Sequence, residues 1–302
     1  MQARSSYVVV VMLAALVLAG CRSSRRAGGC GAALTTVAPP VAIDRGPIAV
    51  VVASPAVPTS RAEAPAGPAL WDELLRTYVE GDYVRYADWK AHPADLRKLD
   101  RFLAWQAEAD VDAMPRADRI AFWINAYNSL NVKMILDHYP VHAPIDIPGY
   151  FDKIQHRVAG RSMTVSEAEY EHLIAEHKDM RAHFAVVCSD RGCLPLRGQA
   201  WTGATLDADL DAAARRFVAD ERHFKVDHDK RVIHISKIFE WYGEKFTKDP
   251  TRPAAKPELF LRPWVDAPTR ALLDSGDYTV QIIEWNWTLN EMHGAAGATA
   301  GT

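Results

Sequence analysis

The chain has 302 residues, of which 49% are hydrophobic, 24% charged and 9% aromatic, and its formal net charge is −3. The composition excludes a collagen-like, a disulfide-dense and a wholly disordered protein. Of the 35 Lys and Arg, six lie in residues 1–68, against two of the 38 Asp and Glu, so the remainder of the chain is acidic. A nucleic-acid-binding domain usually carries a basic stripe, and we therefore expect no nucleic-acid partner.

Residues 1–21 have the pattern of a secretory signal peptide, with Arg4 followed by an apolar run and small residues before Cys21. The run is shorter than the roughly 20 apolar residues of a membrane span, although a single-pass anchor is the alternative. Leu18-Ala19-Gly20-Cys21 resembles the bacterial lipobox, in which the cysteine is lipidated and becomes the new amino terminus. Arg22, rather than an aspartate, follows the cysteine, which by resemblance to Gram-negative lipoproteins favours the outer membrane. We therefore expect an extracytoplasmic lipoprotein, anchored through lipid on Cys21 and facing the periplasm.

The rest of the chain divides into three segments of different amino-acid composition. Residues 22–68 are rich in Ala and Pro and contain no aromatic residue, which is typical of a disordered tether. All nine Trp lie between Trp71 and Trp287, so we place one globular domain at 69–293. Residues 294–302 are predicted to be a flexible tail.

The spacing of hydrophobic residues and the positions of residues that begin or end helices predict the elements of this domain. Helices are expected at 68–79 and 94–107, followed by a central buried helix at about 115–139 that is apolar nearly all round. Ser166 and Glu169 are predicted to form the capping box of a helix to about 177. Buried strand is expected at 183–188, helix at 205–219 and 236–246, a hairpin turning at 227–230, two short helices near Pro257 and Pro268, and a closing strand at 278–285. The pattern indicates a single helix-rich α+β domain with a small sheet.

Five sequence runs in this order carry a family resemblance: DYVRYADW, FWINAYNSLNVKMI, RAHFAVVCSDRGCLPL, ISKIFEWY and WNWTLN. Together they resemble the uncharacterised family catalogued as domain of unknown function 547, over about residues 69–291. The resemblance implies a domain that occurs in bacteria and plants without a settled activity. It transfers no catalytic residues to this chain.

Cys188 is the first candidate for chemistry, because it ends an expected buried strand and precedes a tight turn. Arg191 in that turn could lower the pKa of the thiol, as a catalytic nucleophile requires. The nucleophile also needs a base, and His183 is the nearest histidine in the sequence. Strict alternation along a strand would, however, place His183 and Cys188 on opposite faces.

Three other residues are candidates for the same site. His172 is the alternative base, with Glu169 one helical turn earlier to orient it. Asn125 and Asn128 share one face of the central helix and could orient a substrate or an imidazole, or form a buried structural network.

Trp285-Asn286-Trp287 is expected to pack the last strand, with stacking on a sugar or peptide as the alternative.

Cys188 and Cys193 can also be considered as a pair. Four intervening residues can close a disulfide, and an extracytoplasmic location favours oxidation. Such a disulfide could be a structural crosslink or a redox-active pair. His183, Cys188 and Cys193 are zinc-type ligands, but their spacing is not a standard zinc arrangement and the alternation separates His183 from Cys188. We therefore assign no metal and no cofactor.

Three functions remain open, and whether the protein is an enzyme is undecided among them. The first is a thiol-dependent hydrolase or transferase acting on peptide or envelope material. The second is a binding or assembly module for a protein, peptide or envelope ligand, with a structural disulfide. The third is a thiol redox protein.

Overall fold

The computed structural model describes residues 67–250 and 252–292. The predicted signal peptide with its predicted lipidation site Cys21, nearly all of the predicted tether and the predicted tail at 294–302 lie outside the described residues. Within the described ranges, no helix combines the length and apolarity that crossing a bilayer requires.

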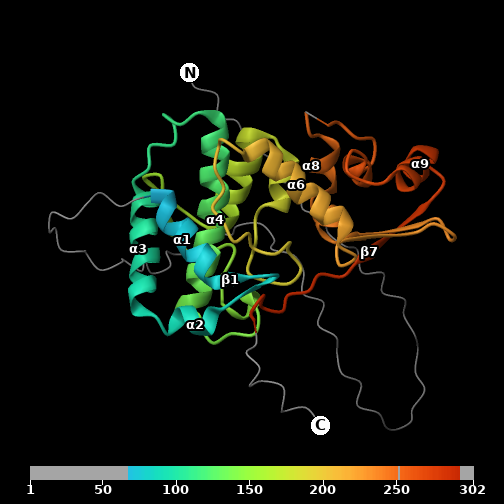
Figure 1. The fold of residues 1–302 in the computed structure, drawn as a ribbon. Helices are drawn as coiled ribbons and strands as arrows, with labels where there is room; N and C mark the ends of the chain where they lie inside the picture. The colour runs from blue at the N-terminus through green and yellow to red at the C-terminus, as the bar shows by residue number, and fades with distance from the viewer. Residues whose placement is uncertain (1–66, 251, 293–302) are drawn as a thin grey trace, which may run out of the picture. The chain divides into compact units, whose positions relative to one another are not determined.

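Helix α4 (Arg116–His138) lies at the centre of the domain (Figure 1). Every residue from Ile120 to Val132 is buried, more than three consecutive turns, so all faces of the helix are covered. The helix ends before the Tyr139–Pro140 peptide bond, where proline disfavours the helical conformation. The central buried helix predicted at 115–139 is therefore confirmed.

Shorter helices pack on both sides of α4 (Figure 1). One side carries α1 (Gly67–Tyr78), α2 (Tyr86–Lys90) and α3 (Pro93–Ala107). The other side carries α5 (Val165–Glu167), the π-helix η2 (Ala168–Ala175), the 3-10 helix η3 (Met180–Phe184) and α6 (Leu206–Ala219). The remaining helical elements are η1 (Pro144–Asp146), α7 (Ile238–Trp241), α8 (Gly243–Thr247), η4 (Pro257–Leu261) and α9 (Ala267–Ser275).

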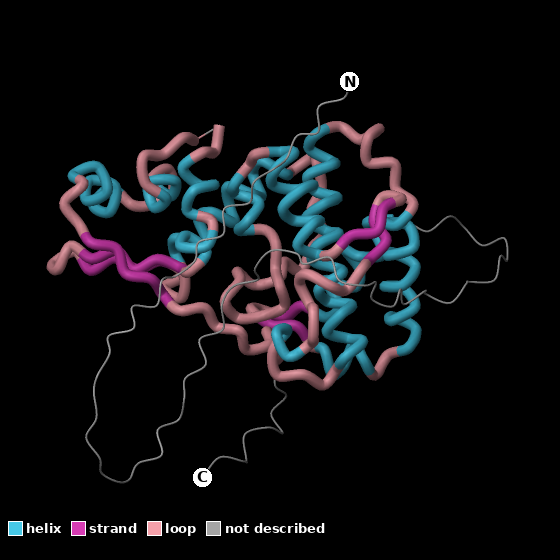
Figure 2. The backbone as a smooth tube through the Cα atoms, turned by 180° about the vertical axis from the view of Figure 1, so that it is seen from behind, coloured by secondary structure: helices cyan, strands magenta, loops and turns pink. Residues whose placement is uncertain are grey.

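The strands of the described residues form three small sheets, which Figure 2 shows as separate strand segments among the helices. They are β1 (Val79–Glu80) with β2 (Tyr83–Val84), β3 (His156–Val158) with β4 (Arg161–Met163), and β5 (Phe224–Asp227) with β6 (Val232–Ser236) and β7 (Thr279–Ile283). The predicted hairpin is β5 and β6, and β7 joins β6 in parallel. Helix outweighs strand, and the α+β class is confirmed, although three sheets replace the single one expected.

The strand predicted at 183–188 is wrong. His183 and Phe184 belong to the 3-10 helix η3, and the residues after it form no strand. Asn128 of α4 replaces a neighbouring strand here: its Oδ1 accepts a hydrogen bond from Val187 N at 2.8 Å, and its Nδ2 donates to Ala185 O at 3.0 Å. The alternation that separated His183 from Cys188 therefore does not apply.

The capping box predicted at Ser166 and Glu169 is displaced by two residues. Thr164 is the N-cap and accepts from Glu167 N at 3.1 Å, while Glu167 Oε2 accepts from Thr164 N at 2.8 Å. The displacement leaves the carboxylate of Glu169 free for a tertiary contact described below.

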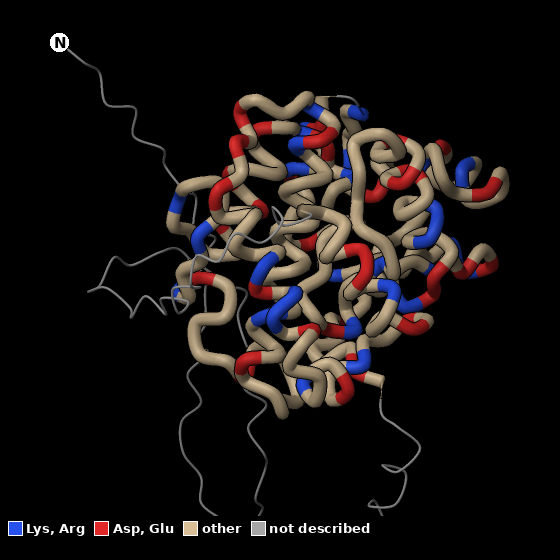
Figure 3. Tube along the Cα trace, turned by 60° about the vertical axis from the view of Figure 1, so that its left-hand side comes forward, with Lys and Arg blue, Asp and Glu red and all other residues tan. Residues whose placement is uncertain are grey.

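Basic and acidic residues are interspersed along the described part of the chain (Figure 3). Many of them are paired, as where Arg216 and Arg222 both contact Asp82 at 2.7 and 2.8 Å. Exposed pairs of this kind contribute little each to stability, so burial around α4 provides most of the driving force for folding.

Candidate functional site

The loop from Cys188 to Cys193 follows η3 and is held by a distant segment of the chain. Asn290 N donates to Ser189 O at 3.0 Å, and Arg191 N donates to Thr288 O at 2.9 Å. Ser189 has a φ of 66°, the left-handed conformation that reverses the chain direction. The turn thereby brings the two cysteines together.

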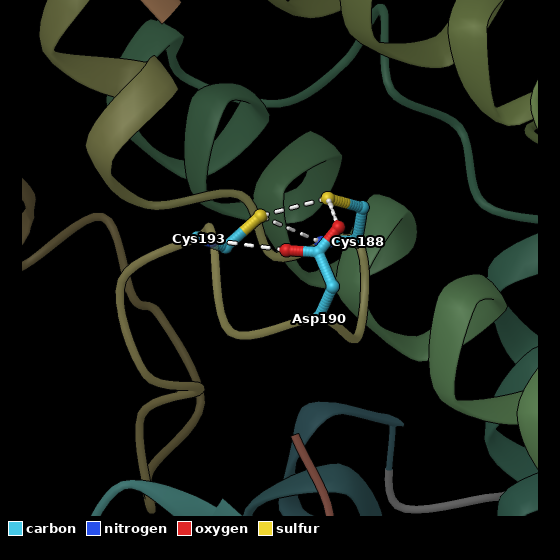
Figure 4. Close-up of side chains that lie close together, drawn as sticks. All are labelled: Cys188, Asp190 and Cys193. Atoms are coloured by element: carbon cyan, nitrogen blue, oxygen red, sulfur yellow. Dashed lines mark hydrogen bonds between the residues drawn. The ribbon is translucent and has the colours of Figure 1, made fainter. Parts of the chain in front are cut away.

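The two thiols and the carboxyl group of Asp190 form one compact cluster (Figure 4). Both cysteines are free, and their Sγ atoms lie 2.8 Å apart. Cys188 Sγ donates to Asp190 Oδ2 at 3.1 Å, and Cys188 N donates to Cys193 Sγ at 3.2 Å. A disulfide bond measures about 2.05 Å, so the sulfur atoms need only a short approach to reach bonding distance when an oxidant removes two electrons and the two protons leave.

Asp190 is fixed between the cysteines by donors on both of its oxygens. Oδ1 accepts from Gly192 N at 2.9 Å and from Cys193 N at 3.0 Å, while Oδ2 accepts from the Trp285 indole at 3.1 Å in addition to the thiol. An aspartate that bonds the backbone two residues onward is an ordinary turn-forming feature. Here the same geometry aims the second oxygen at Cys188.

Burial governs the protonation of the cluster. Burial raises the pKa of Asp190 above its usual range, although the hydrogen bonds from Cys188 and Trp285 oppose this shift. Burial also raises the pKa of Cys188 well above the usual thiol range, with Cys193 and Asp190 adding to the effect. The pKa of Cys193 is raised to about 11, again chiefly by burial. Both thiols are therefore protonated at neutral pH, and a reaction at either sulfur needs a proton acceptor.

Arg191 does not act on the thiols as the sequence suggested. Its guanidinium lies over the ring of Tyr83, 5.1 Å from the centroid. The shift in the Cys188 pKa is upward, opposite to the effect expected from a neighbouring cation.

Trp285 connects the cluster to a surface groove. Its ring packs so closely on Gly192 that a Cβ atom at that position would lie 2.4 Å from the indole. The groove has a volume of about 740 Å³. It is lined by Pro140, Val141, His142, Ala143, Asp146, Trp285, Asn286, Trp287, Thr288, Leu289 and Glu291. Trp285 thus forms part of the groove wall on one side and contacts the cysteine loop on the other.

His183 lies in a separate buried pair. Its Nδ1 is 3.0 Å from Glu169 Oε1, and its ring stacks on Tyr242 with centroids 4.5 Å apart. Its Nε2 has no hydrogen-bond partner among the described residues. The hydrogen bonds of Cys188 Sγ go to Asp190 and Cys193, so the structure does not join His183 to the thiol.

None of the other predicted site residues is hydrogen-bonded to a sulfur atom in the described part of the chain. His172 stacks on Trp123 with centroids 4.6 Å apart, and burial lowers its pKa. Asn125 binds the backbone of Trp201 through both amide atoms, at 2.8 and 3.0 Å. Asn128 binds the backbone that leads into the cysteine loop and so positions that loop. Neither amide is turned toward the thiols.

Sequence reasoning did not assign two residues to the site, Asp190 and Trp285, and expected Trp285 to pack the last strand instead. The first carried a usable signal, because an aspartate two residues before a glycine in a short turn often hydrogen-bonds the following backbone. The second carried none, because 95 positions separate Trp285 from Asp190.

Among the described residues, Cys188, Asp190 and Cys193 also form a group whose ligand atoms could hold a metal ion, since these atoms all lie within 4.8 Å of one another. His183, the third ligand considered in the sequence, is not one of them.

Comparison with known proteins gives one match. Residues 111–218 match the family model described as "Protein of unknown function, DUF547", whereas no curated protein and no solved structure matches the chain. The matched segment contains α4, Glu169, His183 and the loop with both cysteines. The chain thus resembles the DUF547 family over the segment that carries the candidate site, in agreement with the resemblance seen in its sequence motifs.

Proposed function

We propose that this protein is a membrane-tethered, extracytoplasmic thiol–disulfide redox protein, with Cys188 and Cys193 as the reacting pair. The observation that carries the proposal is the 2.8 Å approach of the two Sγ atoms beside the Asp190 carboxyl group. The lipobox-like sequence at Cys21 supports the location, where disulfides form and persist.

We assign the order in which the two cysteines react from the solvent exposure of their side chains. Cys193 is half-buried and Cys188 is 7% exposed, so Cys193 meets a partner first. Its thiol loses a proton to solvent, and the thiolate attacks one sulfur of a partner disulfide, releasing one partner thiolate and forming a mixed disulfide. Cys188 then gives its proton to Asp190, and its thiolate attacks Cys193 Sγ, releasing the second partner thiolate. The protein loses two electrons and the partner disulfide gains them; the released thiolates take up the two protons.

A thiol-dependent hydrolase is less well supported. Such an enzyme pairs its cysteine with a base, commonly a histidine, and activates it by lowering its pKa. Here the acceptor in contact with Cys188 is Asp190. His183 is paired with Glu169 through Nδ1, but among the described residues its Nε2 makes no hydrogen bond to Cys188.

The test is the reduction potential of the pair in the full-length, lipidated protein in detergent. The protein is equilibrated with reduced and oxidised glutathione, quenched with acid, alkylated, and analysed by mass spectrometry. We expect reversible formation of a Cys188–Cys193 disulfide with a potential above about −300 mV, the range of pairs that exchange with glutathione. Cys188→Ser and Cys193→Ser abolish it, while substitution of the cysteine in the predicted tether, Cys30→Ser, is the matched control.

Two results would overturn the proposal. A disulfide with a much lower potential and no exchange with glutathione would make the pair a structural crosslink, and the binding-module alternative would take precedence. Two thiols that alkylate readily and never join would return attention to the hydrolase. The anchor is tested separately, by incorporation of labelled fatty acid into the wild type but not into Cys21→Ser.

A further inference from the structure

We infer that the reduced cluster is a binding site for a thiophilic divalent cation of the zinc class, with Cys188 Sγ, Cys193 Sγ and the Asp190 carboxylate as ligands. The inference goes beyond the proposed function and rests on it in one respect, since the pair must exist as two thiols for the cation to bind.

The donor types fit a zinc-class ion. Thiolate sulfur and carboxylate oxygen are both established zinc ligands, and three protein ligands leave the fourth tetrahedral position for water or for a donor from a partner. All three donor atoms lie within 4.8 Å of one another. Nothing in the donor set favours calcium or magnesium, which take oxygen ligands.

The distances define the adjustment that binding requires. Zinc–sulfur bonds of about 2.3 Å at tetrahedral angles place two sulfur ligands roughly 3.8 Å apart. The observed separation is 2.8 Å, so the sulfurs must separate by about 1 Å. Cys193 is half-buried, and a change in its side-chain torsion can supply this movement. Asp190 Oδ2, at 3.1 Å from Cys188 Sγ, already lies near a ligand position.

The surroundings hold the ligands in place. Gly192 N and Cys193 N fix Asp190 through Oδ1, which leaves Oδ2 directed at the thiols. Cys188 N donates to Cys193 Sγ, a contact that also stabilises a bound thiolate. Hydrogen bonds of this kind around the ligands are a regular feature of protein metal sites.

The negative charge of the ionised cluster is the reason for a cation to bind there. Three acidic groups meet in a buried space, and ionising all three without a cation would bring three negative charges together at a high energetic cost. A divalent ion replaces the protons and offsets that repulsion. A disulfide contains no thiolate, so oxidation by a partner disulfide must release the ion: two zinc-bound thiolates lose two electrons and form one S–S bond, and the partner disulfide becomes two thiolates.

The experiment titrates zinc into the fully reduced, full-length protein against a chromogenic chelator, with the bound metal counted by elemental analysis. We expect one zinc ion per chain, and none after the pair has been oxidised. Asp190→Asn should weaken binding by about tenfold or more, the size of effect seen even for residues that only orient ligands. His183→Gln is the matched control, because His183 is absent from the donor set and should not affect affinity.

Cobalt(II) provides a readout that does not depend on whether the variants fold. Cobalt bound by the wild type should show thiolate-to-metal charge-transfer absorption, which disappears on oxidation of the pair. The inference is overturned if the reduced wild type binds no zinc, if cobalt shows no thiolate absorption, or if His183→Gln, and not Asp190→Asn, removes binding. If the pair exchanges with glutathione but the reduced protein binds no zinc, the proposed function stands and this inference alone is overturned. If the reduced protein binds zinc but the pair does not exchange with glutathione, this inference stands and the proposed function is overturned.

Discussion

The indole Nε1 of Trp285 donates a hydrogen bond of 3.1 Å to Oδ2 of Asp190, the oxygen that also contacts the Cys188 thiol. A residue near the end of the described chain thus covers one side of the cysteine loop, with its ring against Gly192. Access of small reagents to the thiols therefore depends on Trp285.

Trp285→Ala should make the cysteine loop more reactive. The substitution removes both the hydrogen bond to Asp190 and the packing on Gly192, so the loop opens more often. Alkylation of Cys188 and Cys193 in the reduced protein at neutral pH should accelerate about tenfold, equivalent to about 1.4 kcal/mol in the free energy of opening.

Trp287→Ala is the matched control for this prediction. Trp287 packs on Phe151, Trp241 and Trp285, with centroids 6.1, 5.9 and 6.0 Å away, so its removal perturbs the same aromatic surface while the Trp285 hydrogen bond to Asp190 and the packing on Gly192 can remain. Equal acceleration in the two variants would show that general loosening, and not the cover provided by Trp285, sets the alkylation rate.

The parts of the fold that were predictable from sequence depend on local patterns. Helix α4 is uninterrupted and apolar nearly all round and is ended by Pro140, and the β5–β6 hairpin has polar residues at its turn. The run at 183–188 was ambiguous in principle, because a short apolar segment fits a buried strand or a buried irregular segment equally well. The side chain of Asn128 on α4 hydrogen-bonds Ala185 O and Val187 N of this run. These backbone groups therefore make no hydrogen bonds to a neighbouring strand, and the run is irregular.

The two cysteines of the candidate site could be predicted from the sequence, but the residues that contact them could not. Cys188 and Cys193 are close in sequence, and a turn between them brings their sulfurs together. Pairing of 189–191 with 288–290 and the contact of His183 with Glu169 are tertiary relationships that no local spacing encodes. The π-helix η2 that carries Glu169 also departs from the regular helical period used to assign that residue to His172.

Asn128→Ala should lower stability more than Asn131→Ala on the same helix. Asn128 satisfies two buried backbone groups, Val187 N and Ala185 O, and both lose a partner in the variant. The free energy of unfolding should fall by about 2–4 kcal/mol, measured by urea denaturation of the reduced protein.

Asn131→Ala provides the comparison. Asn131 is equally buried, but the only hydrogen bond of its side chain among the described residues runs from Nδ2 to Tyr127 O in the same helix. Its removal should cost about 1 kcal/mol. Losses of the same size for the two variants would contradict the role assigned to Asn128 in holding the segment that precedes Cys188.

Glu169→Ala should weaken the fold and leave the redox pair working. The variant removes the acceptor 3.0 Å from His183 Nδ1, in a place where water has little access, and should cost about 1–3 kcal/mol in thermal or urea unfolding. The disulfide should still form in glutathione buffers, because neither Glu169 nor His183 is hydrogen-bonded to a sulfur.

Glu171→Ala, at an exposed position of the same helix, is the control and should leave stability unchanged within about 0.5 kcal/mol. Loss of disulfide exchange in Glu169→Ala, in protein shown to be folded, would instead assign the Glu169–His183 pair a part in thiol chemistry.

His223 should make the protein less stable in acid. Its side chain is 2% exposed, and burial lowers its pKa to about 4, with the attraction of Asp220 at 3.8 Å too weak to compensate. An unfolded histidine titrates near 6.5. Between about pH 6.5 and 4 the unfolded chain therefore binds more protons than the folded protein, and the free energy of unfolding falls as the pH falls. The contribution of His223 is complete above about pH 6.5 and is lost progressively below it, by up to about 3 kcal/mol at pH 4.

His223→Gln should flatten this pH dependence, measured as the free energy of unfolding in urea at half-unit steps from pH 7 to 4. A residual slope is expected, because burial also lowers the pKa of His156 to about 4. His92→Gln, at an exposed position, is the matched control and should keep the wild-type slope. If His223→Gln were to keep that slope as well, the acid sensitivity would have to come from other groups, and His223 would have to be protonated in the folded protein at a higher pH than its burial indicates.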